Sequence, residues 1–307
     1  MNDVSIGIIG MGWVGTGVAS SILHKGICRE LLLNDARKEI AEGEAMDFNH
    51  GSPFYSSAEV RAVEIEEMLN CKAIVITAGR GGKPDESRLD LLKENIKIVK
   101  NISAKLKGFK GILIIVANPV DILTYFYQKY TKLPPGQVIG TGTMLDTARL
   151  REMIGKKLAL EPKSVHAQVI GEHGDSEVVL WSRAMIGGIP LREWKDWNSE
   201  YESEIGERVR RAAYEIIKRK GATNHAIGLV TATLLKWILR GEKRIINLST
   251  LISGPYGIND IAISLPSMVS NKGVIDVLEL KMTDSESKAL QKSVRVISDA
   301  INSVKMF

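Results

Sequence analysis

The sequence has few cysteines and no long apolar run, and both absences limit what the chain can be. Cys28 and Cys71 are too few for a disulfide framework and do not cluster with histidines, so we expect no metal site. No apolar stretch approaches the ~20 residues that a membrane span needs, so we expect no membrane partner. We read no secretory or transit signal at the N-terminus, which makes the cytoplasm the expected location.

The chain also lacks an extended basic patch, although its net charge is +5. Basic residues are dispersed and largely interleaved with acidic ones. The densest group, residues 218–220, ends an expected helix, where cations complement the helix dipole. We therefore expect no nucleic-acid partner.

The first half alternates short apolar runs with helical patterns, which predicts a parallel sheet with helical crossovers. The runs at residues 73–76 and 112–116 are apolar without alternation, as in strands that are covered on both faces. The expected strands are residues 4–9, 30–33, 71–77 and 111–117, and the expected helices are residues 13–24, 38–48 and 86–107.

After about residue 143 the pattern changes, and at 307 residues the chain exceeds the usual size of a single core. Long helices are expected at residues 199–220, 225–239 and 284–303, with strand-like segments over residues 244–269. We therefore predict a Rossmann-type doubly wound parallel sheet over residues 1–143, followed by an α+β catalytic and substrate-binding domain over residues 144–307. The active site is expected between the two.

A glycine-rich turn joins the first expected strand to the first expected helix. Gly10, Gly12 and Gly15 permit a tight turn and let a pyrophosphate approach the N–H groups at a helix start. Asp35 ends the next strand, where a carboxylate can accept hydrogen bonds from the adenosine ribose and repel a 2′-phosphate. This context predicts NAD rather than NADP, although Arg37 weakens the exclusion of NADP.

Polar residues follow two further strands, at the end where ligands bind in such sheets. Thr77, Ala78 and Gly79 end one expected strand, and Asn118 follows the next. Asn118 could contact the nicotinamide ribose or the substrate, or it could start a turn, as Asn before proline commonly does. The sequence leaves these two roles open.

Two short polar motifs, residues 145–149 and 170–175, supply a histidine, a carboxylate and a guanidinium. A histidine bonded to a buried aspartate can exchange a proton with a substrate oxygen near neutral pH, and an arginine beside it can bind a carboxylate. His173, Asp146 and Arg149 therefore fit hydride exchange between a 2-hydroxy acid and a nicotinamide. The alternative is a turn histidine beside an ion pair along a helix.

Six motifs in order resemble those of the L-lactate dehydrogenases within the lactate/malate dehydrogenase superfamily, over essentially the whole chain. They lie at residues 10–15, 42–47, 118–121, 140–143, 145–149 and 171–176. The resemblance implies NAD-dependent interconversion of pyruvate and L-lactate. It implies His173 as the proton donor and acceptor, Asp146 as its orienting partner, and Arg149 as the group that binds the substrate carboxylate.

The resemblance assigns roles to further residues. Arg88 matches a mobile-loop arginine that polarises the substrate carbonyl as a lid closes and excludes water, although Glu86 and Asp90 would also suit an ordinary surface charge. Asn118 and Thr223 match residues of the substrate pocket. The implied cofactor-binding residues are Gly10, Gly12, Trp13, Val14, Gly15, Asp35, Thr77, Ala78, Gly79, Asn95 and Asn118.

The chain departs from the family pattern at Gly82, where lactate dehydrogenases have glutamine and malate dehydrogenases have arginine. Without arginine, the second carboxylate of oxaloacetate lacks a charged partner unless Arg80 is recruited, and Asp85 and Glu86 add negative charge. Glycine also leaves room for larger side chains. A malate dehydrogenase and a dehydrogenase of bulkier 2-hydroxy acids therefore remain alternatives, and a non-catalytic dinucleotide-binding protein is a more distant one.

Arg151 and His166 match positions that bind fructose 1,6-bisphosphate across a subunit interface in allosteric bacterial lactate dehydrogenases. Facing their symmetry mates, they would make a phosphate site; otherwise Arg151 lies on a helix surface and His166 is buried in a strand. The resemblance implies a homo-oligomer, a tetramer or a dimer, that acts on a small 2-keto or 2-hydroxy acid. The preferred side chain and the dependence on the activator are left open.

Overall fold

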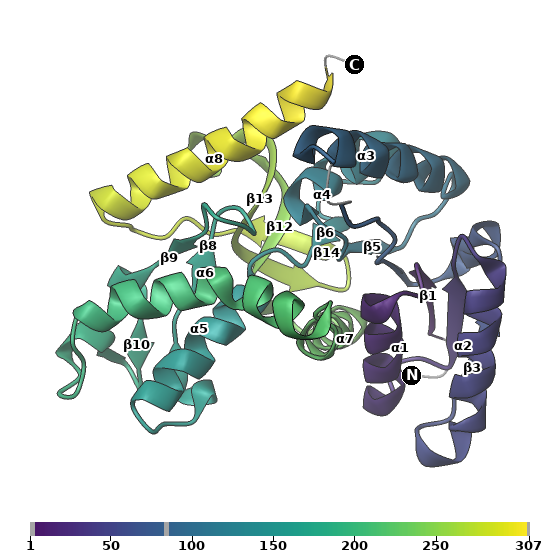
Figure 1. Ribbon diagram of the computed structural model, residues 1–307, viewed down its shortest axis with the longest axis horizontal. Helices are drawn as coiled ribbons and strands as arrows, with labels where there is room; N and C mark the ends of the chain where they lie inside the picture. Colours follow the sequence, from purple (N-terminus) through teal and green to yellow (C-terminus); the bar gives the residue numbers. More distant parts are fainter. Residues whose placement is uncertain (1–3, 83–85, 306–307) are drawn as a thin grey trace.

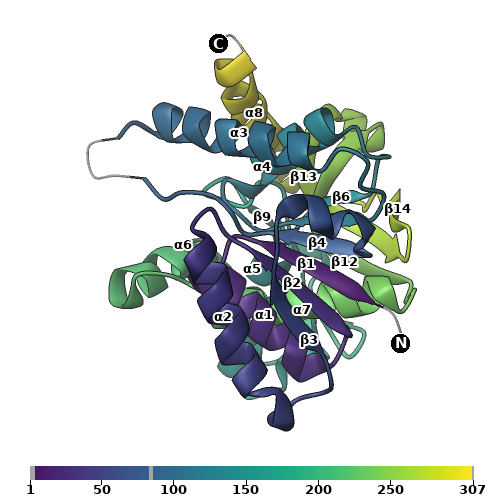
Figure 2. The same ribbon diagram turned by 90° about the vertical axis from the view of Figure 1, so that its right-hand side faces the viewer.

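The structure, a computed structural model, describes residues 4–82 and 86–305. Within these residues, nine strands form one sheet in the order β14-β13-β12-β6-β5-β4-β1-β2-β3 (Figure 1 and Figure 2). The strands are β1 (Ser5–Ile9), β2 (Glu30–Asn34), β3 (Glu59–Ala62), β4 (Ala73–Ile76), β5 (Ile112–Ile115), β6 (Val138–Gly140), β12 (Arg244–Ser253), β13 (Asn259–Ser270) and β14 (Gly273–Val277).

Strands β1 to β6 make the parallel part of the sheet, in the spatial order β3-β2-β1-β4-β5-β6. β4 is buried throughout, with Ile74 and Ile76 in one apolar cluster and Ala73 and Val75 in the other. Because successive side chains of a strand point to opposite faces, both faces of the sheet are covered. The expected doubly wound parallel sheet is confirmed.

Helices cover the two faces of the sheet. They are α1 (Trp13–Lys25), α2 (Lys38–His50), α3 (Arg88–Lys105), α4 (Val120–Thr131), α5 (Met144–Lys157), α6 (Glu200–Lys220), α7 (His225–Leu239) and α8 (Asp284–Lys305). α3, α4 and α8 pack on one face, and α1, α2 and α7 pack on the other (Figure 1). Across the described residues, no helix has the length and apolar character to span a bilayer.

The carboxyl-terminal half continues this sheet. β12 pairs with β6 through Ser249 and Gly140, and β13 and β14 follow in antiparallel order. α5 and α6 form a lobe with five short strands and an apolar core that includes Leu150, Val165 and Val209. The short strands are β7 (Val165–His166), β8 (Val169–Ile170), β9 (Val178–Val179), β10 (Met185–Ile186) and β11 (Ile189–Pro190). The expected α+β half is therefore present, packed along the edge of the parallel sheet.

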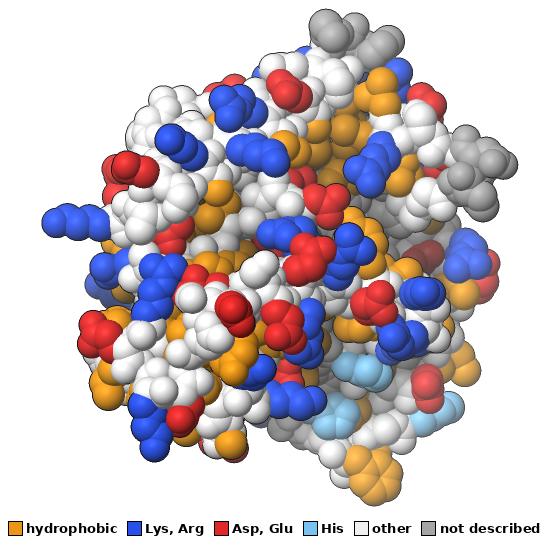
Figure 3. Space-filling model, turned by 60° about the vertical axis from the view of Figure 1, so that its left-hand side comes forward, with side chains coloured by type: hydrophobic (Ala, Val, Ile, Leu, Met, Phe, Trp, Pro, Cys, Tyr) orange, Lys and Arg blue, Asp and Glu red, His pale blue; other side chains and the backbone are white. Residues whose placement is uncertain are grey.

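The sequence patterns did not show β3, β6 or α4. β3 and β6 have four and three residues, too few to display a period of two. α4 is buried all round from Val120 to Gln128, and its polar residues Asp121, Thr124 and Gln128 are buried with the rest, so no exposed polar face marks this helix. On the surface seen in Figure 3, Lys and Arg side chains are interspersed with Asp and Glu, as the dispersed charges of the sequence predict.

α1 and α7 cross at two glycines. A Cβ on Gly228 would overlap the carbonyl oxygen of Gly17, and a Cβ on Gly17 would lie 2.9 Å from the carbonyl oxygen of Asn224. Glycine at both positions therefore sets the spacing of the two helices. The crossing joins the helix that starts at the glycine turn to the loop that carries Thr223.

We expect Gly228→Ala to lower the free energy of unfolding by roughly 2–3 kcal/mol, because the backbone of α1 would have to move. Gly43→Ala in α2 is the matched control, since a Cβ there would meet no atom within 4 Å. That substitution should instead stabilise by about 0.5–1 kcal/mol. Urea unfolding measures both changes, and equal effects would contradict the close crossing.

Candidate active site

The turn after β1 packs against the backbone that follows β4 on one side and is open at Gly12 on the other. Gly10 has a φ of +103°, and a Cβ there would lie 2.5 Å from the Ala78 nitrogen. A Cβ on Gly15 would overlap the Gly10 carbonyl oxygen, so the turn itself requires both glycines. A Cβ on Gly12 would meet no atom within 4 Å, and a ligand can approach the N–H groups of α1 from this open side.

Asp35 follows β2 and is hydrogen-bonded to the glycine turn. Its Oδ2 accepts the Met11 N–H at 2.7 Å, and its Oδ1 accepts the Arg37 N–H at 3.0 Å. The glycine turn therefore lies at the carboxyl end of β1, and the Asp35 carboxylate lies at the carboxyl end of β2. Both are beside the position between β1 and β4 where the strand order reverses, which is where ligands bind in such sheets. The residues present fit a dinucleotide, with its pyrophosphate at α1 and a ribose at Asp35.

The end of β4 shapes the same turn. The Thr77 hydroxyl donates to the carbonyl oxygens of Gly10 and Ile9, at 2.5 and 3.2 Å. The Ala78 N–H donates to the Ile9 carbonyl oxygen at 2.9 Å. Thr77 and Ala78 therefore have a structural part in the turn, whatever contact a cofactor adds.

Asn95 is buried in α3, at 1% exposure, and holds the start of the loop before that helix. Its Oδ1 accepts the Arg80 N–H at 2.9 Å, and its Nδ2 donates to the carbonyl oxygens of Arg80 and Leu91, at 3.2 and 3.1 Å. A Cβ on Gly79 would lie 3.2 Å from Asn95 Oδ1. Asn95 thus fixes the backbone at Arg80, shortly after the end of β4.

Asn118 is exposed after β5, before a cis peptide bond to Pro119. Its Oδ1 accepts the Val120 N–H at 3.2 Å, which caps α4. Its Nδ2 has no hydrogen-bond partner among the described residues. The capping role that the sequence left open is therefore observed, and the exposed amide nitrogen can still serve a ligand.

His173, Asp146 and Arg149 meet in one cluster. Asp146 Oδ2 lies 2.5 Å from His173 Nδ1, and Asp146 Oδ1 accepts an Arg149 Nη1–H at 2.8 Å. The Asp146 side chain is 2% exposed, whereas those of His173 and Arg149 are 22% and 13% exposed. Since Nδ1 donates to the carboxylate, Nε2 is left for a substrate. The helical ion pair considered from the sequence is present, as part of this cluster.

Hydrogen bonds hold α5 against β8, the strand that precedes the histidine motif. The Thr143 hydroxyl donates to the Val169 carbonyl oxygen at 2.6 Å, and the Thr147 hydroxyl accepts the Val169 N–H at 3.0 Å. The N–H of His173 donates to Asp121 Oδ2 at 2.7 Å. The cluster is therefore held in place by the protein's own contacts.

Electrostatics favour the protonated form of His173. Burial alone would lower the pKa of His173, but the charge and hydrogen bond of Asp146, with the charge of Asp121, raise the pKa to about 9. Burial alone would raise the pKa of Asp146, but His173 and Arg149 hold that pKa below its ordinary value. At neutral pH an imidazolium therefore faces a carboxylate.

Comparison with known families agrees with this geometry. Residues 4–140 match the lactate/malate dehydrogenase NAD binding domain, and residues 143–307 match the lactate/malate dehydrogenase alpha/beta C-terminal domain. The chain belongs to the lactate/malate dehydrogenase family. NAD is its cofactor, as the glycine turn and Asp35 predict.

Similar proteins cover the whole chain. A Fervidobacterium nodosum protein named L-lactate dehydrogenase is 44% identical over 313 residues, which is 98% of this chain and 99% of the relative. An L-lactate dehydrogenase of Thermoanaerobacter pseudethanolicus is 42% identical over 308 residues, 98% of each chain. The crystal structure of the minor L-lactate dehydrogenase from Enterococcus mundtii in the ligands-bound form has a TM-score of 0.96 at 38% identity and 99% coverage of both chains. The resemblance to the lactate branch is confirmed.

The segment that the resemblance assigns to a lid precedes α3, and Lys83, Pro84 and Asp85 in it lie outside the described residues. Arg88 begins α3 and is exposed. Burial is the main cause that raises the pKa of Tyr214 in α6, and the charge of Arg88 opposes it. The start of α3 therefore lies near α6, but within the described residues Arg88 makes no hydrogen bond to the histidine cluster.

Arg80 and Glu86 pair across this loop. Arg80 Nη1 donates to Glu86 Oε2 at 2.9 Å, and Arg80 Nη2 donates to Glu86 Oε1. Recruitment of Arg80 to a second substrate carboxylate would therefore break a bidentate ion pair. Gly82 is exposed, and a Cβ there would lie 3.2 Å from Leu91 Cδ2.

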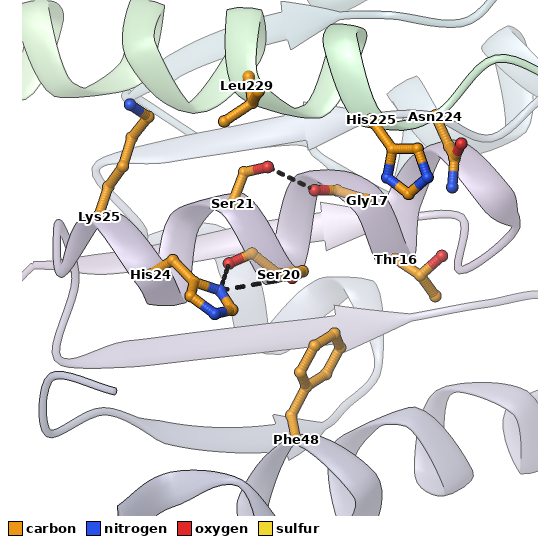
Figure 4. Close-up of a pocket in the computed structure, with 10 residues that line it drawn as sticks. All are labelled: Thr16, Gly17, Ser20, Ser21, His24, Lys25, Phe48, Asn224, His225 and Leu229. Carbon is orange, nitrogen blue, oxygen red and sulfur yellow. Dashed lines mark hydrogen bonds between the residues drawn. The ribbon is translucent and has the colours of Figure 1, made fainter. Parts of the chain in front are cut away.

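Thr223 is half-buried in the loop between α6 and α7. Its neighbours Asn224 and His225 line a pocket of about 500 Å³ (Figure 4), whose other walls come from α1, from Phe48 of α2 and from Leu229 of α7. The described lining includes no residue of the cluster around Asp146, so this pocket is distinct from the candidate active site.

Arg151 and His166 lie on neighbouring elements. Arg151 Nε donates to the Ala167 carbonyl oxygen at 3.0 Å, which places α5 beside the strand that carries His166. Burial lowers the pKa of Arg151. His166 is exposed, so the alternative of a buried strand histidine is wrong.

Asp121 and Glu177 are buried acids of the site that the sequence patterns did not single out. Burial raises the pKa of Asp121 to about 6. Asp121 belongs to the motif at residues 118–121, and Glu177 directly follows the motif at residues 171–176. Their place in or beside these motifs was the only sign in the sequence that they belong to the site, because tertiary packing decides whether an acid is buried.

Asp146→Asn should lower the pKa of His173 by roughly one to two units, because the imidazolium loses its charged partner. An NMR titration of His173 measures the shift. The wild-type pKa is raised from 6.5 to about 9, so the stability that this pair contributes is complete below pH 6.5 and is lost towards pH 9. Asp146→Asn should therefore cost less stability above pH 9 than near pH 6.

Asp175→Asn is the control for this titration, because that carboxylate accepts a hydrogen bond from the Tyr214 hydroxyl at 3.3 Å and none from His173. The pKa of His173 should stay near the wild-type value. A shift of similar size in both variants would show that the Asp146 contact does not set the protonation of His173.

Proposed function

We propose that this chain interconverts pyruvate and L-lactate with NADH and NAD. The observation that carries the proposal is the Asp146 carboxylate, bonded to His173 through one oxygen and to Arg149 through the other. A proton donor and a carboxylate binder held at a fixed spacing suit the carbonyl and carboxylate of a 2-keto acid. The names of the relatives at 42% and 44% identity support the same activity.

His173 is the proposed proton donor in the direction of reduction. With a pKa of about 9 it is an imidazolium at neutral pH, so its Nε2–H can bond to the keto oxygen and protonate that oxygen as its charge grows. NADH, when bound, supplies the hydride for the carbonyl carbon. In the direction of oxidation, neutral His173 accepts the hydroxyl proton, and Asp146 stabilises the resulting imidazolium.

Arg149 is the proposed binder of the substrate carboxylate. One of its N–H groups is bonded to Asp146, and a guanidinium has five, so enough remain for a bidentate pair. The side chain is 13% exposed, which lets it reach the opening while most of it is shielded from water. Shielding strengthens a charge-assisted hydrogen bond.

Arg88 is assigned to the lid. From the start of α3 it would have to move over the cluster when the loop closes, where its guanidinium would polarise the substrate carbonyl. Arg80 and Glu86 are paired, so closure would carry these two residues together. Closure would also exclude water from the reacting atoms.

The protein residues assigned to the side-chain end of the substrate favour pyruvate over oxaloacetate. Gly82 offers no cation, and Arg80 is paired with Glu86. We assign Asn118 and Thr223 to the remaining wall of the pocket. Because glycine also leaves space at residue 82, bulkier 2-keto acids are the second candidate substrates.

The cofactor is assigned to residues 1–143 and the substrate to residues 144–307, with the active site between them. The open side of Gly12 and the ribose position at Asp35 support this division. The assigned cofactor contacts are Gly10, Gly12, Trp13, Val14, Gly15, Asp35, Thr77, Ala78, Gly79, Asn95 and Asn118.

We assign the protein to the cytoplasm as a homo-oligomer, either a dimer or a tetramer. Large apolar side chains on several helices support association, because burying them against a second copy removes apolar surface from water. They include Met46, Tyr214, Ile217 and Leu229. Arg151 and His166 are assigned to fructose 1,6-bisphosphate between copies.

His173→Asn should lower kcat for pyruvate by roughly 10²–10⁴-fold, because the proton donor is lost. The Kd for NADH should stay unchanged, since the glycine turn is untouched. Steady-state assays and fluorescence titration with NADH measure the two quantities. His50→Asn at the end of α2 is the control, and full turnover in the His173 variant would remove that residue from the mechanism.

Among pyruvate, oxaloacetate, 2-ketobutyrate and 2-ketoisocaproate, pyruvate should give the highest kcat/KM. Steady-state NADH oxidation measures all four, each with and without fructose 1,6-bisphosphate. A lead for oxaloacetate would point to Arg80 as the reader of the second carboxylate, and a lead for the branched acid would point to the space at Gly82. No NADH oxidation with any of them would favour a non-catalytic dinucleotide-binding protein.

A further inference from the structure

Glu177 closes the turn that carries His173. Its N–H donates to the Gly174 carbonyl oxygen at 3.2 Å, and β9 begins at the next residue. β9 pairs with β8 through Val178 and Ile170, and it lies between α6 and α8 (Figure 1). The backbone of Glu177 is therefore fixed relative to the histidine motif.

The Glu177 side chain is buried without a full set of partners. It is 6% exposed, and its Oε1 is buried with no hydrogen-bond partner among the described residues. It lines a pocket of about 620 Å³ together with Arg210 of α6. Arg210 makes no hydrogen bond to Glu177 among the described residues, because its Nη1 donates to Glu207 at 2.6 Å and its buried Nε has no partner.

Two further acids that line this pocket have hydrogen-bond partners other than Glu177. Glu202 is paired with Arg192, and Glu286 accepts hydrogen bonds from Ser182. The charged groups that line the pocket with Glu177 or act on its charge are Asp146 and Arg149 from α5, Glu202, Glu207 and Arg210 from α6, Glu286 from α8, and His173 from its own turn. Glu172 and Asp175 are the other acids of that turn.

An ionised carboxylate in this position would be costly, since a buried charge needs a partner. Burial, followed by the charge of Asp146, raises the pKa of Glu177 to about 8, and the nearby cations offset this only in part. The cations near Glu177 are His173, Arg149 and Arg210. The buried carboxyl of Glu177, unpartnered among the described residues, is thus favoured in its protonated form.

We propose that Glu177 is a positioning residue that keeps its proton at neutral pH, so that Asp146 alone balances the imidazolium and the guanidinium. The proposal rests on the proposed function, and it assigns to Glu177 control of the net charge of that site. When Glu177 is neutral, the anionic keto acid is not repelled by a second buried negative charge beside Asp146. Above neutrality Glu177 releases its proton to water in the pocket, and the carboxylate formed favours the protonated state of His173.

Glu177→Gln tests the proton directly, because glutamine has the shape and charge of the protonated acid. The unfolded acid ionises near 4.5 and the folded acid near 8, so the wild type loses stability across this window whereas the glutamine variant does not. The Tm of Glu177→Gln should therefore exceed that of the wild type by about 3 °C or more at pH 8.5, with the smallest difference near pH 5.

The same variant should shift the pH profile of the reaction. In the wild type, ionised Glu177 keeps His173 protonated at alkaline pH, so without it the alkaline limb of kcat/KM for pyruvate should move down by about half a pH unit. Glu202→Gln is the matched control, since it makes the same change in the same pocket wall at a carboxylate paired with Arg192. It should leave the limb in place.

A Tm difference that is constant from pH 5 to pH 8.5 would show that Glu177 does not hold a proton and would overturn the proposal. An unmoved alkaline limb, with the expected Tm profile, would overturn the link to His173. If the wild type does not oxidise NADH with any keto acid, the proposed function fails while the Tm experiment still tests the proton on Glu177.

Discussion

The Asp146 carboxylate is the constraint on which the active site depends. At 2% exposure it could not remain ionised without compensation, and it has a cation on each oxygen, His173 and Arg149. The same two bonds fix the distance between His173, the proposed proton donor, and Arg149, the proposed carboxylate binder. Desolvation of one acid therefore supplies both the protonation state and the geometry that a 2-keto acid needs, and α5 must be held against β8 for this to work.

The carboxyl-terminal lobe is tied to the nucleotide-binding sheet at the same place. The N–H of His173 donates to Asp121, which lies in the first turn of α4, next to the Asn118 cap at the carboxyl end of β5. The segment that bears His173 is thus bonded to the part of the chain that bears Asn118. The continuous sheet through β6 and β12 makes this connection rigid, because a shift between the halves would break backbone pairing.

Much of this arrangement could be predicted from the sequence, since it depends on local patterns. Apolar runs marked β1, β4 and β5, the glycine turn marked the cofactor site, and the spacing of Asp146 and Arg149 placed both on one face of a helix. Tertiary contacts were beyond such patterns. The pairing of Arg80 with Glu86, the orphaned oxygen of Glu177 and the exposure of His166 follow from packing between elements that are distant in the chain or across a loop.

These contacts shift the pKa values of neighbouring side chains in opposite directions. Asp146 titrates below its ordinary value, whereas the pKa values of Asp121, Glu177 and His173 are raised to about 6, 8 and 9. Burial alone would make every group neutral, so the groups that stay charged are those with a charged partner. Asp146 is hydrogen-bonded to two cations and stays ionised, whereas Glu177, among the described residues, is hydrogen-bonded to none of its neighbouring cations and keeps its proton. The partners, more than the depth of burial, decide which group carries charge when an anionic substrate arrives.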